Sequence, residues 1–112
     1  MKIAIIGAGN LGLSIAKGLI VNNAFTTLYL TKRKIEELQN YEEYSKVKVT
    51  KDNREAVQNS DILVFAVQPT QMERILEEIK DQLTEKHVLI STVTGFKIAA
   101  MEAIVGMDQF IV

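Results

Sequence analysis

The feature that most constrains this chain is the run KIAIIGAGNLGLSIAKGL near its start. An apolar segment at residues 3–6 leads directly into three glycines, Gly7, Gly9 and Gly12, which have the spacing G-x-G-x-x-G. A helical pattern then follows over residues 10–21. A strand, a glycine turn and a helix in direct succession are typical of the first part of a βαβ unit. The run therefore predicts a parallel sheet.

The remainder of the chain repeats the alternation of strand and helix. Apolar runs such as DILVFAV and HVLIST are apolar on both faces, as in parallel strands that are covered on both sides. The sequence therefore predicts an α/β fold, a doubly wound, mostly parallel sheet of the Rossmann-like type. Further strands are expected at residues 27–30, 47–49, 62–67, 87–92 and 109–112, and further helices at residues 34–44, 53–59, 69–83 and 98–106.

Composition narrows the class of protein. A chain of 112 residues with 47% hydrophobic residues is expected to form one domain, residues 1–112, with a core of its own. A net charge of -1 excludes a general attraction to nucleic acid or anionic membranes. The absence of cysteine excludes disulfides and thiolate chemistry. We expect a cytoplasmic protein with no metal site.

Each glycine of the loop has a distinct expected role. Gly7 permits the tight turn, Gly9 lets the backbone approach a pyrophosphate, and Gly12 lets the helix pack closely on the strand. The amides of residues 8–11 would then point at the phosphates from the start of a helix, where free N–H groups and the helix dipole favour an anion. The motif predicts a dinucleotide site, with a simple packing turn as the alternative.

The end of the second strand indicates which dinucleotide is bound. NAD-dependent enzymes place a carboxylate there, about 20 residues after the glycines, for the ribose 2′-hydroxyl. Here the strand ends in Thr31, Lys32 and Arg33, followed by Lys34. A hydroxyl and up to three cations would suit a 2′-phosphate, so we expect NADP, with NADPH preferred over NADH. The alternative is a solvated, charged turn.

Three blocks of the sequence resemble the amino-terminal domain of the pyrroline-5-carboxylate reductase family. They are IGAGNLGLSIAKGL, DNREAVQNSDILVFAVQPTQMERILEEI and LISTVTGFKIAAMEAIVG, and the likeness covers nearly the whole chain. The resemblance implies an oxidoreductase of proline biosynthesis. It also implies the following cofactor-binding residues: Ile6, Gly7, Ala8, Gly9, Asn10, Leu11, Gly12, Thr31, Lys32, Arg33, Asn53, Ala66, Val67, Gln68, Pro69, Thr92, Val93 and Thr94.

These residues divide along the cofactor that the resemblance implies. Residues 6–11 would hold the pyrophosphate, and residues 66–69 would pass beside the cofactor. Residues 92–94 would lie near the nicotinamide, unless they are a plain strand end. Asn53 would contact the nucleotide, unless it caps the helix that follows it. The chain departs from the family pattern at Gln68, Thr70, Thr94 and Lys97, and this leaves the exact substrate open.

The resemblance also implies chemistry that needs no nucleophile from this chain. Hydride transfer from NADPH to the C=N carbon of a cyclic imine would give proline, and the protein would position the two molecules. The family carries a further helical domain that forms a homo-oligomer and much of the imine pocket. We therefore expect residues 1–112 to be one domain of a longer protein and to be inactive alone, with no catalytic residue among them.

Two other function classes fit the glycine loop. One is the cofactor domain of another dehydrogenase of the β-hydroxyacid, prephenate or F420-linked type, and the other is a non-catalytic nucleotide-sensing module. The remaining candidate residues have structural interpretations. His87 is expected at the surface or at a sheet edge, and Met72, Met101 and Met107 are expected to fill the core.

Overall fold

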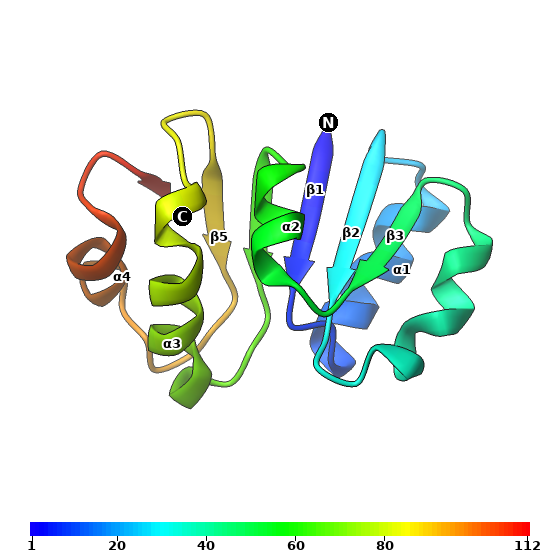
Figure 1. Ribbon diagram of the computed structural model, residues 1–112, viewed down its shortest axis with the longest axis horizontal. Coiled ribbons are helices and arrows are strands. Elements are labelled where there is room, and N and C mark those ends of the chain that lie inside the picture. The colour runs from blue at the N-terminus through cyan, green and yellow to red at the C-terminus, as the bar shows by residue number, and fades with distance from the viewer.

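Six parallel strands form one sheet in the computed structural model, which describes residues 1–112 (Figure 1). The strands are β1 (Lys2–Ile6), β2 (Thr27–Thr31), β3 (Val47–Thr50), β4 (Ile62–Phe65), β5 (Val88–Ser91) and β6 (Phe110–Ile111). Their order across the sheet is β3-β2-β1-β4-β5-β6, and every neighbouring pair is parallel. The doubly wound α/β fold predicted from the sequence is confirmed.

Helical segments connect the strands. They are α1 (Asn10–Val21), η1 (Ile35–Glu43), α2 (Asn53–Gln58), α3 (Pro69–Ile79), η2 (Lys80–Gln82) and α4 (Ile98–Val105). The segment expected as an ordinary helix at residues 34–44 is instead a 3-10 helix, η1. It buries only Leu38 completely, and a short polar segment with so little packing gains little from regular α-helical geometry.

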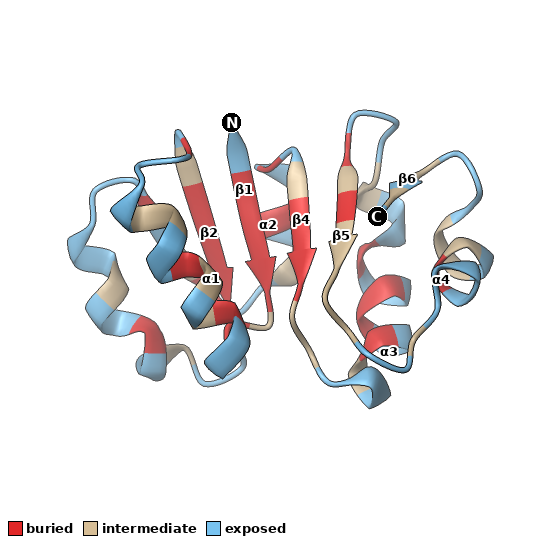
Figure 2. Cartoon of the chain, turned by 180° about the vertical axis from the view of Figure 1, so that it is seen from behind, coloured by how far each residue is buried: buried red, intermediate tan, exposed pale blue.

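The helical segments cover the two faces of the sheet unequally. The helices α2, α3 and α4 pack on the face that presents residues such as Ala4, Leu63 and Phe65. The segments α1 and η1 pack on the opposite face, which Figure 2 views directly. Right-handed crossovers explain this division, because the chain steps one way across the sheet from β1 to β3 and the other way from β3 to β6.

The neighbouring strands β1 and β4 are followed by connections that run in opposite directions across the sheet. The two strands pair along their length, up to Ile6 opposite Phe65. Beyond that pair the glycine turn leads to α1 on one face, whereas residues 66–68 lead to α3 on the other. Loops that diverge in this way open a crevice at the carboxyl ends of the strands, which is where open α/β sheets bind ligands.

Two interpretations of single residues are wrong. Met72 and Met101 are fully buried as expected, but Met107 is 82% exposed because it lies in the uncovered turn between α4 and β6. His87 is only 6% exposed, so it is not a surface residue. Its Nδ1 accepts the backbone N–H of Thr84 at 2.9 Å, and its Nε2 donates to the carbonyl oxygen of Val57 at 3.0 Å. His87 therefore joins the start of β5 to α2.

None of the helices combines the length and the apolar character that crossing a membrane requires.

Candidate dinucleotide-binding site

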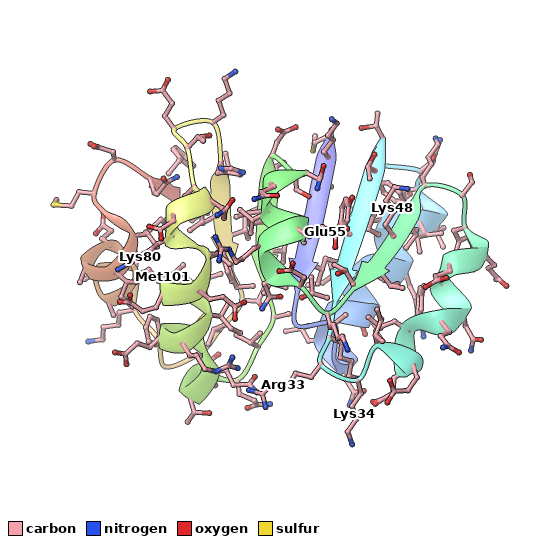
Figure 3. All side chains as sticks on the ribbon, viewed as in Figure 1. Arg33, Lys34, Lys48, Glu55, Lys80 and Met101 are labelled. Carbon is pink, nitrogen blue, oxygen red and sulfur yellow. The ribbon has the colours of Figure 1, made fainter.

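A cleft of about 540 Å³ lies at the carboxyl ends of β1, β2, β3 and β4, on the side of α3. This volume is within the usual range for small-molecule sites. Figure 3 shows Arg33 and Lys34 beyond the tips of the central strands, at this edge of the sheet. The cleft is lined by Gly7, Gly9, Thr31, Lys32, Arg33, Lys34, Lys51, Asn53, Ala66, Val67, Gln68, Gln71, Arg74, Ile75 and Glu78.

The glycine loop shapes one end of the cleft. Gly7 has φ +84°, and a Cβ added there would lie 2.2 Å from Cγ1 of Val67. A Cβ on Gly12 would lie 2.9 Å from the carbonyl oxygen of Gly7. The predicted roles of Gly7 in the turn and of Gly12 in close packing are therefore confirmed. Gly9 has open space where its Cβ would be, and it lines the cleft.

Only some of the backbone amides of residues 8–11 are free, whereas the sequence predicted that all of them would point at the phosphates. The N–H of Ala8 donates to the carbonyl oxygen of Thr31 at 2.7 Å, and the N–H of Gly9 donates to that of Gly7 at 2.8 Å. Neither can face a phosphate as well. The N–H groups of Asn10 and Leu11, in the first turn of α1, have no acceptor within the chain. The free donors are thus the helical ones, which have no carbonyl four residues earlier to bind.

At the end of β2, two of the residues expected to contact a 2′-phosphate already have partners within the chain. Thr31 is 1% exposed, and its Oγ1 accepts the N–H of Gly7 at 3.1 Å. This hydroxyl couples β2 to the glycine loop. Lys32 forms an ion pair with Glu37, with Nζ 3.2 Å from Oε1. Arg33 is exposed at the mouth of the cleft and has no ion-pair partner.

Asn53 does not cap α2. The cap is Asp52, whose Oδ1 accepts the N–H of Arg54 at 2.9 Å. Asn53 is the first residue of the helix, and its Nδ2 donates to Oε1 of Glu78 on α3 at 3.0 Å. The helix-cap alternative for Asn53 is therefore wrong, and its side chain lies at the cleft instead.

Other predicted residues lie around the cleft without lining it. Ile6, at the end of β1, and Ala8, within the glycine loop, are buried. Pro69 begins α3. The hydroxyl of Thr92 donates to the carbonyl oxygen of Phe65 at 2.7 Å, and this contact ties the end of β5 to the end of β4. The remaining predicted residues outside the lining are Asn10, Leu11, Gly12, Val93 and Thr94.

Helix α3 contributes a wall of the cleft that was not predicted from the sequence. Gln71, Arg74 and Glu78 line the cleft together with Ile75, and Lys51 joins them from the turn after β3. Their spacing of three and four residues places the α3 members on one side of that helix. This spacing was a signal in the sequence, but only the packing of α3 shows which side meets the cleft.

Comparisons with known proteins place the chain in a family. Residues 2–95 match the family described as NADP oxidoreductase coenzyme F420-dependent. Pyrroline-5-carboxylate reductase 2 of Dictyostelium discoideum is 36% identical over 111 residues, which are 97% of this chain and 37% of that protein. The chain thus spans less than half the length of this relative.

Solved structures agree with the sequence comparison. A pyrroline-5-carboxylate reductase from Coxiella burnetii superposes with a TM-score of 0.90 at 34% identity, over 98% of this chain and 42% of that one. The pyrroline carboxylate reductase of Plasmodium falciparum with NADP bound superposes with a TM-score of 0.83 at 26% identity, over 99% of this chain and 40% of that one. The chain therefore belongs to the NADP oxidoreductase coenzyme F420-dependent family, with pyrroline-5-carboxylate reductases as relatives along nearly its whole length.

Proposed function

We propose that the chain is the NADP(H)-binding domain of an oxidoreductase that reduces 1-pyrroline-5-carboxylate to proline. The observation that carries the proposal is the cleft itself, in which a glycine loop, the start of α1 and the exposed cations after β2 meet. The names of the relatives in sequence and in structure support the choice of substrate.

The residues present fit a dinucleotide at the pyrophosphate end. The open side of Gly9 leaves room for a group that must approach the backbone closely. Beside it, the N–H groups of Asn10 and Leu11 are free to donate, and the start of a helix favours an anion. These features suit a pyrophosphate better than an uncharged ligand.

At the opposite end the residues fit an additional phosphate. No carboxylate stands at the end of β2 to accept a ribose 2′-hydroxyl, and Lys32 and Arg33 stand there instead. We therefore assign these two residues to a 2′-phosphate and infer a preference for NADPH over NADH. The ion pair between Lys32 and Glu37 leaves Arg33 as the stronger contributor of the two.

The chemistry follows from positioning. NADPH, when bound, supplies the hydride that reduces the C=N carbon of the imine. The chain's own residues hold the cofactor in the cleft beyond the ends of β1 and β4. Residues 66–68 line this cleft and lie beside the cofactor. A protonated imine is already electrophilic, so the chain needs no nucleophile, and we assign none of its residues a catalytic role.

The imine pocket and the subunit contacts belong to the same proposal. The chain covers 37–42% of the Dictyostelium and Coxiella relatives, so much of a whole reductase is outside this domain. We infer that the remaining part supplies most of the imine site and that the whole protein is a homo-oligomer.

Calorimetric titration of the chain with NADPH and with NADH, in one low-salt buffer, tests the proposal. We expect both to bind and NADPH to bind more tightly, with the Arg33→Gln variant losing most of the difference. Circular dichroism establishes that each sample is folded. A folded chain that binds neither nucleotide contradicts the assignment, and equal affinity for both contradicts the preference.

A further inference from the structure

The cleft carries an excess of positive charge, and only part of it comes from the residues that follow β2. Its lining holds five cationic side chains and one carboxylate, whereas the whole chain has a net charge of -1. Three of the cations follow β2. The other two, Lys51 and Arg74, come from separate elements, the turn after β3 and the second turn of α3.

Lys51 and Arg74 are free to bind a ligand. The chain contains only two ion pairs, Lys32 with Glu37 and Lys80 with Glu77, and neither involves them. The one carboxylate of the lining, Glu78, already accepts a hydrogen bond from Asn53. By contrast, Lys32 is already ion-paired with Glu37, and the hydroxyl of Thr31 already accepts a hydrogen bond from the N–H of Gly7.

We propose that Lys51 and Arg74 form a second cationic wall of the 2′-phosphate site, facing the cations that follow β2, and that they set cofactor specificity together with Arg33. The proposal rests on the NADP(H)-binding function argued above. A phosphate monoester at the ribose 2′ position carries close to two negative charges at neutral pH, more than one cation can balance. A guanidinium on one wall and further cations on the other would match it.

The alternative is that both side chains are ordinary solvated charges. Two other residues serve as matched controls because they have the same types and are also exposed, but do not line the cleft: Arg54 on α2 and Lys48 on β3. Figure 3 shows Lys48 well away from Arg33 and Lys34. The comparison is therefore between like charges inside and outside the cleft.

The experiment measures the dissociation constants of NADPH and NADH for four variants of the chain: Arg74→Gln, Lys51→Gln, Arg54→Gln and Lys48→Gln. We expect each cleft variant to weaken NADPH binding about 3- to 10-fold and NADH binding less than about 2-fold. The controls should change neither by more than about 2-fold. The salt dependence of NADPH binding should also become shallower in the cleft variants, because fewer charges pair with the ligand.

The outcomes separate this inference from the proposed function. If Arg33→Gln lowers the preference for NADPH but the two cleft variants do not, the second wall is refuted and the domain assignment stands. If the cleft variants weaken both nucleotides equally, their role is general attraction and the specificity claim is wrong. Absence of any nucleotide binding by the folded parent chain would refute both.

Discussion

The side-chain amide of Asn53 on α2 donates a hydrogen bond to the carboxylate of Glu78 on α3, with Nδ2 and Oε1 3.0 Å apart. A carboxylate can only accept, so this contact determines which way the amide points. The side-chain oxygen of the same amide, Oδ1 of Asn53, has no partner in the chain, and it is left as an acceptor for a ligand hydroxyl or amine at the cleft.

Two uncharged substitutions of Glu78 separate the effect of its hydrogen bond to Asn53 from the effect of its negative charge. Glu78→Gln keeps an acceptor for Asn53, whereas Glu78→Leu does not. We expect NADPH to bind about 2- to 10-fold more weakly to the leucine variant than to the glutamine variant, as loss of one hydrogen bond implies. Calorimetric titration measures the difference.

The same pair of changes in an Asn53→Ala background provides the control. If Glu78 acts through Asn53, the difference between glutamine and leucine disappears in that background. A difference that persists there would show that Glu78 affects the cleft by another route.

Gly7 and Gly9 are expected to separate stability from binding. Gly7→Ala forces an alanine backbone to adopt φ +84° and places the alanine Cβ 2.2 Å from Cγ1 of Val67. The strained backbone alone costs about 1–2 kcal/mol, and the clash adds to it. We expect the free energy of unfolding to fall by at least this amount, as measured by urea denaturation.

Gly9→Ala is the matched variant, because its Cβ would meet no atom within 4 Å. We expect its stability to stay within about 0.5 kcal/mol of the parent while its affinity for NADPH falls. Unchanged affinity would mean that no ligand approaches the backbone at Gly9.

The stability of the domain should decline at alkaline pH because of Tyr29. Burial, and secondarily the carboxylate of Glu55, raise the pKa of Tyr29 above its ordinary value of 10.0. Between the unfolded and the folded pKa, the native state holds a proton that the unfolded state has lost. The free energy of unfolding therefore falls as the pH rises above 10.0, and the contribution is fully present below it.

Tyr29→Phe removes this titration, so we expect the loss of stability as the pH rises above 10.0 to become smaller. Thermal unfolding at a series of pH values measures it. Tyr44→Phe, at a tyrosine that is 43% exposed, is the control. An unchanged slope in Tyr29→Phe, or an equal change in Tyr44→Phe, would contradict the assignment to Tyr29.

His87 is expected to contribute to stability rather than to catalysis. His87→Phe leaves the N–H of Thr84 without an acceptor. It also removes one donor from the carbonyl oxygen of Val57, which still accepts the N–H of Ser60 at 3.3 Å. We expect a loss of about 1–3 kcal/mol in the free energy of unfolding, which urea denaturation measures. Met107→Ala, at an exposed position, should change it by less than about 0.5 kcal/mol. The affinity of both variants for NADPH should equal that of the parent chain.

The sequence by itself determined the features that depend on neighbouring residues. Apolar runs on both faces predicted parallel strands, and α1 begins and ends where its pattern does, at Asn10 and Val21. The glycine spacing predicted the turn at Gly7 and the close packing at Gly12, since both are limits imposed by the local backbone and by the missing side chain. The absence of a carboxylate after β2 was likewise visible.

Only the tertiary structure decided which groups those elements bring together. The partners of Ala8 and Thr31 lie 23 and 24 residues away along the chain, so no local pattern showed that their polar groups were already bonded. The burial of His87 likewise depends on α2, and the residues that α3 contributes to the cleft depend on which side of that helix faces it. Hydrogen bonding and burial are set by groups that meet through folding, whereas propensity and periodicity describe only the segment that carries them.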